Sequence, residues 1–160
     1  MRYSQIRDLD ISNGKGIGVS LFLQGCPLHC KDCFNKETWD FNGGKEWTKD
    51  VEDEFLNLVS RPYIERVSIL GGEPLAQSYE VFLLVGKIKN VHPGIKIWIY
   101  SGYTIEEILQ SREYTKAIIG ADVLVDGRFD TNKKDQNLDF RGSYNQRIID
   151  IQKYLRGNNC

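Results

Sequence analysis

Short runs of apolar residues alternate along this chain with longer segments in which apolar side chains recur every three or four positions. The runs at residues 17–24, 66–70, 95–100 and 121–125 are rich in β-branched residues and predict strands. The periodic segments between them predict helices that each bury one face. A last strand is predicted at residues 147–151. Strands that alternate with helices indicate an α/β fold with a parallel sheet built from βαβ units.

Polar residues predict where the helices begin. We expect Asp50 and Ser78 to cap the first two helices, and Thr104 with Glu107 to form a capping box on the third.

An unusual segment follows each of the four main predicted strands. In chain order these are a cysteine cluster, Gly-Gly-Glu-Pro (71–74), Ser-Gly-Tyr (101–103) and Asp-Gly-Arg (126–128). Because the carboxyl ends of parallel strands meet at one edge of a sheet, we expect these segments to gather in a single site.

Length and composition are those of one ordinary globular domain. The chain has 160 residues, a net charge of -1 and no basic block, so nothing points to nucleic acid as a partner. No apolar run approaches the roughly 18 residues that span a membrane, and the polar N-terminus lacks the apolar core of a secretory signal. We therefore expect a cytoplasmic protein without a membrane partner, with one domain over residues 1–155 and a flexible tail over 156–160.

Three of the four cysteines, Cys26, Cys30 and Cys33, lie close together. In a reducing compartment this clustering indicates metal binding rather than a disulfide framework. Closed structural zinc sites use four ligands, and the only nearby candidate, His29, would strain the loop because it adjoins Cys30. We therefore predict a four-iron cluster with three cysteine ligands and one open iron, with zinc as the alternative. Cys160 is either a further ligand or, as we prefer, an exposed thiol without a role.

Several other residues at the predicted edge have two interpretations. The Gly-Gly-Glu-Pro segment could simply end a strand, but beside the cysteines we favour an ammonium-binding edge made by Gly72 and Glu73. The hydroxyls of Tyr100, Ser101 and Tyr103, at the end of one strand, could reach a ligand. Asp126 is either part of the site or the cap of the following turn. Trp98 is at least as well explained by packing.

Four segments resemble the radical S-adenosylmethionine (SAM) superfamily, and more closely the activating components of anaerobic (class III) ribonucleotide reductases. The last of them is the most discriminating for this group of glycyl-radical-enzyme activases. Together the segments run from residue 13 to residue 147 and comprise Asn-Gly-x-Gly (13–16), the cysteine cluster with Thr38 and Trp39, Gly-Gly-Glu-Pro-Leu (71–75), and Asp-Gly-Arg-Phe (126–129) with Arg-Gly-Ser-x-Asn-Gln-Arg (141–147).

The resemblance implies a fold and a set of cofactors. The fold is a partial radical SAM β/α barrel, open and truncated, with parallel strands. The cofactors are a [4Fe–4S] cluster on the three clustered cysteines and SAM, whose methionine amino group lies at Gly72 and Glu73. In the superfamily an aromatic residue usually precedes the third cysteine and covers the adenine. Here Asp32 stands there, so Phe34 is the candidate, and Ser101 and Asp126 are further candidate cofactor contacts.

The resemblance also implies a reaction. Reductive cleavage of SAM gives methionine and a 5′-deoxyadenosyl radical, which takes a hydrogen atom from a glycine of the partner reductase. The expected partners are the glycine loop of the reductase's catalytic subunit and a one-electron donor such as flavodoxin. The long polar segment 126–147 is expected to serve the partner more than SAM, or else to close the open side of the barrel through Phe129 and Phe140.

Two alternatives remain open from the sequence. One is another small radical SAM enzyme, which activates a different glycyl radical enzyme or acts on a small nucleobase precursor. The other is a non-catalytic zinc-binding module. Metal analysis separates the zinc module from the enzymes, and the reaction product separates the two enzymes from each other.

Overall fold

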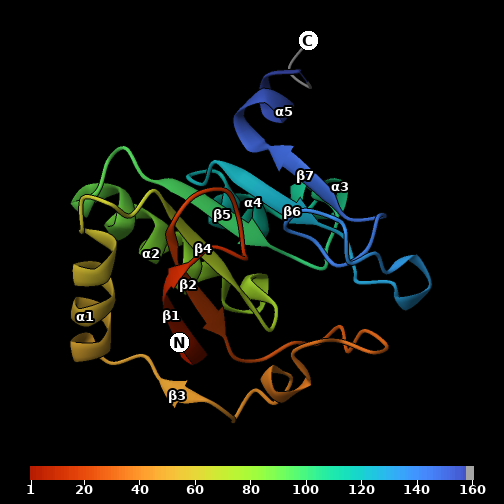
Figure 1. Cartoon of the computed structure of the whole chain (residues 1–160), viewed down its shortest axis with the longest axis horizontal. Helices are drawn as coiled ribbons and strands as arrows, with labels where there is room; N and C mark the ends of the chain where they lie inside the picture. Colours follow the sequence, from red (N-terminus) through yellow and green to blue (C-terminus); the bar gives the residue numbers. More distant parts are fainter. Residues whose placement is uncertain (158–160) are drawn as a thin grey trace.

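Seven strands form one open sheet in the order β3-β1-β2-β4-β5-β6-β7 in the computed structural model, which describes residues 1–157 (Figure 1). The four central strands run parallel, as predicted. The sheet is nevertheless mixed, because its three outer strands run antiparallel to their neighbours, so the expectation of a wholly parallel sheet is wrong at both edges. The central strands are β2 (Gly18–Leu23), β4 (Arg66–Gly71), β5 (Lys96–Tyr100) and β6 (Val123–Asp126), and the outer ones are β1 (Arg2–Asp10), β3 (Lys45–Glu46) and β7 (Arg147–Asp150).

The long strand β1 was not expected from the sequence. Only two of its nine residues, Tyr3 and Asp10, are buried, so the strand has no apolar run to reveal it. Its backbone pairs with β2 along most of its length, with two irregularities in register. Pairing with a buried neighbour, and not side-chain composition, therefore determines this strand.

The helices connect the parallel strands, and two of the predicted caps are wrong. Thr48 caps the first helix by accepting the N–H of Val51, so Asp50 lies inside the first turn. Ser78 begins the second helix without capping it, because a 3₁₀ turn precedes it. The capping box of Thr104 is confirmed. The helices are α1 (Lys49–Val59), α2 (Ser78–Val91), α3 (Ile105–Leu109), α4 (Arg112–Ile118) and α5 (Ile151–Gly157), and the 3₁₀ turns are η1 (Lys36–Thr38), η2 (Pro74–Gln77) and η3 (Thr131–Lys133).

Alternate residues of the central strands face opposite sides of the sheet. One side packs with the helices in the main hydrophobic core, to which the strands contribute Val19, Leu21, Leu23, Val67, Ile69, Ile97, Ile99 and Leu124. The intervening residues face away from that core. They include Ser20, Ser68, Leu70, Trp98, Tyr100 and Val125, a more polar set that leaves room for a site.

A buried arginine holds the β1–β2 connection against this second face. The guanidinium of Arg66 donates to the backbone oxygens of Asp10 at 2.6 Å and Asn13 at 3.1 Å, and its side chain is completely buried. Gly14, at φ +137°, passes so close that a Cβ there would lie 2.5 Å from the Arg66 Cδ atom. The Asn-Gly-x-Gly segment thus packs tightly on the arginine, which an ordinary exposed turn would not do.

Two long loops extend beyond the same end of the sheet. In Figure 1 the orange loop after β2 and the blue segment between β6 and β7 lie on the same side of the molecule. At the C-terminal end, α5 includes Arg156 and Gly157, which the sequence had placed in a flexible tail. Residues 158–160, and with them Cys160, lie outside the described residues.

Candidate functional site

The predicted edge of the sheet contains a cavity of about 360 Å³. Its walls come from the end of each central strand and from the two long loops, so segments more than 100 residues apart in the sequence meet there. The lining includes Ser12, Asn13, Cys26, Leu28, Cys30, Cys33, Phe34, Trp39, Gly72, Glu73, Tyr100, Ser101, Gly127, Phe129, Phe140, Arg141 and Gln146.

The cysteine loop is fixed to its own far end by backbone hydrogen bonds. After β2 the chain turns at Gly25, where φ is +94°, and the N–H of Gly25 donates to the Thr38 oxygen at 2.7 Å. The N–H of Cys26 donates to the Trp39 oxygen at 3.2 Å. These bonds close residues 25–39 into a loop whose three cysteines, one buried and two half-buried, line the cavity.

Backbone N–H groups surround the thiols. The N–H of Asn35 points to the Cys33 sulfur at 3.4 Å, and Phe129 from the other loop supplies an N–H to Cys30. Burial raises the pKa of the Cys26 thiol, and burial together with the neighbouring Cys33 raises that of Cys30. Without a metal these thiols therefore stay protonated, and binding one must release protons.

Three thiols on one loop suit an iron–sulfur cluster or a zinc ion. Among residues 1–157, no group of three His, Cys, Asp or Glu side chains is placed to hold a single ion. In a cluster each cysteine binds a different iron, so the three thiols need not meet at one point.

His29, the sequence's only candidate for a fourth ligand, has another partner. Its ring stacks on the Trp39 indole with the centroids 4.4 Å apart. The stack holds the middle of the cysteine loop against the loop's end, which gives His29 a structural role.

Glu73 is a buried carboxylate held in one orientation. Its Oε1 accepts the Leu75 N–H at 3.0 Å and the Ser101 hydroxyl at 2.9 Å, and its Oε2 accepts the Gly102 N–H at 2.8 Å. Burial raises the pKa of Glu73 to about 7, although the three hydrogen bonds act in the opposite direction. Glu73 therefore caps η2, as the structural interpretation of the Gly-Gly-Glu-Pro segment expects, and it also lines the cavity, where its contact with an ammonium group stays a prediction.

Gly72 allows a close approach, but to the protein's own backbone. A Cβ on Gly72 would lie 2.3 Å from the backbone oxygen of Gly25. The neighbouring N–H of Glu73 donates to that same oxygen at 2.8 Å. Gly72 thus lets the end of β4 lie against the start of the cysteine loop, and it lines the cavity at that junction.

Two of the other predicted contacts, Ser101 and Phe34, reach the cavity. The Ser101 hydroxyl donates to Glu73 and accepts the Tyr103 N–H, so it orients the carboxylate rather than standing free. Phe34 is 63% exposed at the mouth and packs on Phe129 with the centroids 4.9 Å apart.

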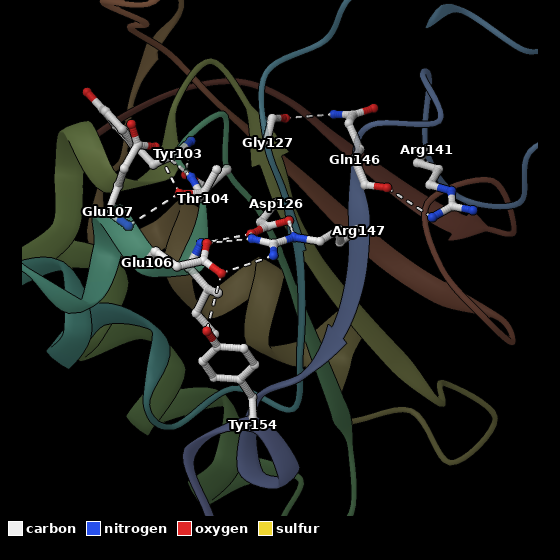
Figure 2. Close-up of polar contacts among 12 residues, drawn as sticks. Tyr103, Thr104, Glu106, Glu107, Asp126, Gly127, Arg141, Gln146, Arg147 and Tyr154 are labelled. Carbon is white, nitrogen blue, oxygen red and sulfur yellow. Dashed lines mark hydrogen bonds and ion pairs between the residues drawn. The ribbon is translucent and has the colours of Figure 1, made fainter. Parts of the chain in front are cut away.

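Asp126 is not among the residues that line the cavity, and its role as a cofactor contact stays a prediction. Its buried carboxylate accepts the Ile105 N–H at 2.7 Å and forms an ion pair with Arg147. Figure 2 shows Arg147 between Asp126 and Glu106, with Tyr154 of α5 reaching Glu106. Asp126 therefore binds the first N–H of α3, which Thr104 caps, and it anchors β7, whereas the sequence had suggested a cap for the turn after it.

The segment between β6 and β7 forms one wall of the cavity. Gln146 ties its two ends together, because its side chain donates to the Gly127 oxygen at 3.0 Å (Figure 2). The same side chain accepts the Gly142 N–H at 2.9 Å. Phe140 packs edge-on against Trp98 of β5. The segment thus covers part of the open face, and its Arg141 lines the same cavity as the cysteines.

Some lining residues were not predicted as site residues. Leu28 inside the cysteine loop and Leu138 in the far wall are single apolar residues in polar segments, and no local pattern marks them. Tyr100, by contrast, was expected from its place at a strand end to reach a ligand. It lines the cavity at the end of β5, and its buried hydroxyl has no hydrogen-bond partner among the described residues.

Within residues 1–157, no helix is long and apolar enough to cross a membrane.

Comparison with known proteins gives matches along nearly the whole chain. A family described as a 4Fe-4S single cluster domain matches residues 12–149. Three proteins named anaerobic ribonucleoside-triphosphate reductase-activating protein are similar to this chain. That of Escherichia coli (strain K12) is 38% identical over 150 residues, covering 91% of this chain and 96% of that protein. That of Vibrio cholerae serotype O1 is 37% identical over 152 residues, covering 92% and 97%. That of Enterobacteria phage T4 is 35% identical over 150 residues, covering 92% and 93%.

Proposed function

This chain belongs to the family of anaerobic ribonucleoside-triphosphate reductase-activating proteins, and we propose that it uses a [4Fe–4S] cluster and SAM to install a glycyl radical on an anaerobic ribonucleotide reductase. One observation carries the proposal: three cysteines and one buried carboxylate, from two different strand ends, line the same cavity. Thiolates suit iron, and a buried carboxylate suits an ammonium group.

Cys26, Cys30 and Cys33 are the proposed ligands, and each binds one iron. The N–H groups that surround their sulfurs stabilise the thiolates and the charge of the cluster. When bound, the cluster supplies an open iron for SAM and the electron that splits SAM into methionine and a 5′-deoxyadenosyl radical. The protein's own residues bind, orient and shield the reactants.

Glu73 is the proposed partner of the methionine ammonium group. Two backbone N–H groups and the Ser101 hydroxyl fix its carboxylate before SAM arrives, so the side chain loses little conformational entropy when SAM binds. The ammonium favours the ionised carboxylate and offsets the burial that raises its pKa. Phe34 with Phe129 offers an aromatic surface for the adenine at the mouth of the cavity.

The second face of the sheet is the proposed interior of a truncated radical SAM barrel. Four parallel strands with helices on one side and a cavity on the other support this proposal. The open side leaves an approach for the glycine loop of the reductase. A one-electron donor of the flavodoxin type would reduce the cluster from the half-buried side, at Cys30 and Cys33.

The test is electron paramagnetic resonance of the anaerobically reconstituted protein with SAM, a reductant and the reductase. The expected result is a glycine-centred radical on the reductase and 5′-deoxyadenosine in solution. Deoxyadenosine without a protein radical would favour a small radical SAM enzyme with a different substrate. One zinc per chain, with no iron or sulfide, would favour the zinc-binding module and overturn the proposal.

A further inference from the structure

Trp39 ends the cysteine loop in a fixed position. Its backbone oxygen accepts the N–H of Cys26, and the Thr38 oxygen before it accepts the N–H of Gly25. Its side chain lines the cavity together with the three cysteines. The indole is therefore attached to the cysteine loop itself and moves with it.

Two neighbours of the indole, His29 and Lys36, lie over the faces of its ring rather than at its edge. His29 stacks on it at 4.4 Å with an angle of 19° between the ring planes, and the Lys36 Nζ lies 6.0 Å from the ring centroid. These contacts hold the plane of the ring but supply no acceptor to the Nε1–H at its edge.

The Nε1 atom of Trp39 is buried and has no hydrogen-bond partner among residues 1–157. A buried indole N–H normally finds an acceptor, because an unpaired buried donor costs roughly 1–3 kcal/mol. Trp47 of the same chain follows this rule, since its Nε1 donates to Glu52 at 3.1 Å. Trp39 lines the cavity, so a group bound there can supply the acceptor that its Nε1–H lacks.

We propose that the Nε1–H of Trp39 donates a hydrogen bond to a sulfur of the bound [4Fe–4S] cluster and raises the cluster's reduction potential. This inference rests on the proposed function, because it needs the cluster. Sulfide and thiolate sulfurs gain negative charge when the cluster is reduced, so a donor stabilises the reduced state more than the oxidised one. SAM is the competing acceptor in the same cavity. The potential measured without SAM separates the two acceptors, because only a hydrogen bond to the cluster can change it.

The test compares Trp39→Phe with Trp47→Phe. Phenylalanine keeps a ring to stack on His29 but has no N–H, and the second variant removes an indole that already has a protein acceptor. The midpoint potential is measured by anaerobic titration without SAM. Trp39→Phe should retain its iron and sulfide while its reduction equilibrium shifts several-fold toward the oxidised state, where a tenfold shift corresponds to about 59 mV for one electron. Trp47→Phe should match the wild type.

An unchanged potential in Trp39→Phe would overturn the inference, and a loss of SAM affinity alone would assign the N–H to SAM instead. A second measurement uses the intact protein, so that it does not depend on the variant assembling a cluster. With ¹⁵N-labelled indole, pulsed paramagnetic resonance of the reduced cluster should detect one coupled nitrogen, and its absence would equally overturn the inference. If the wild type itself binds no iron, the proposed function fails first.

Discussion

The guanidinium of Arg147 donates two hydrogen bonds to the carboxylate of Asp126, from Nε at 3.0 Å and from Nη2 at 2.6 Å. The carboxylate is almost completely buried, and the arginine is 45% exposed. A residue at the start of the last strand therefore neutralises a charge at the end of the strand beside it. Their pairing joins β6 to β7 at the point where the cavity wall begins.

Arg147→Ala should lower the free energy of unfolding by roughly 1–3 kcal/mol, because it leaves the buried Asp126 without its cation. Urea unfolding measures the change. Arg61→Ala is the matched control, since it removes an ion pair to Asp8 in which both partners are more than a third exposed. The control should lower the free energy of unfolding much less, because solvent screens an exposed pair. Equal losses in the two variants would mean that the Asp126 pair is no stronger than a surface pair.

Replacing Cys26, Cys30 or Cys33 singly by alanine should abolish cluster assembly and formation of 5′-deoxyadenosine, because a three-ligand site has no spare thiolate. Iron and sulfide analysis after anaerobic reconstitution is the measurement. Cys160→Ala, which alters the remaining cysteine, should keep both activities. Normal iron content in any of the first three variants would remove that residue from the ligand set.

Glu73→Ala should keep the cluster but weaken SAM binding, because the carboxylate lies on a different strand end from the cysteines. Loss of one charge-assisted contact predicts roughly a 10- to 100-fold higher dissociation constant. Equilibrium titration of the reconstituted protein with SAM tests this. Glu80→Ala, on the exposed side of α2, is the control. A variant that loses its iron would show that the glutamate supports the cluster loop instead.

Glu73 should also make the stability of the cluster-free protein depend on pH. Its pKa is about 7 when folded, against 4.5 for an unperturbed glutamate. The folded state thus holds the proton more tightly than the unfolded state does, and this difference stabilises the fold. The contribution is fully present below pH 4.5 and is lost as the pH rises through 7. Between pH 5 and pH 8 the wild type should lose roughly 2–3 kcal/mol relative to Glu73→Gln, which cannot ionise. Urea unfolding across this range is the measurement, and parallel curves for both proteins would contradict the assignment.

Gly72→Ala should destabilise the protein and reduce its iron content, because the new Cβ would collide with the Gly25 backbone. Gly86→Ala is the opposite case, since Gly86 lies inside α2 with no atom within 4 Å of the added carbon. The second variant should gain roughly 0.5–1 kcal/mol from its higher helix propensity. Thermal unfolding compares the two, and a neutral Gly72→Ala would mean that the two loops can separate without cost.

The sequence predicted the features that local pattern determines. The four central strands are buried and rich in β-branched residues, so their apolar runs identify them, and their order places the cysteines and Glu73 at one edge. The strand β1 was missed because its pairing, and not its composition, makes it a strand. The role of Asp126 was also beyond local pattern. Its partner is 21 residues away across a polar loop, and only the fold brings the two together.

The cavity draws its walls from residues 12 to 146, nearly the full span of the chain. On a ribosome, which makes the chain from its N-terminus, the cysteine loop emerges early as an exposed segment with nothing opposite it. The glutamine that ties the far wall together is among the last residues to appear. The complete cavity therefore exists only after synthesis is almost complete, and iron and sulfide can enter the finished site only then.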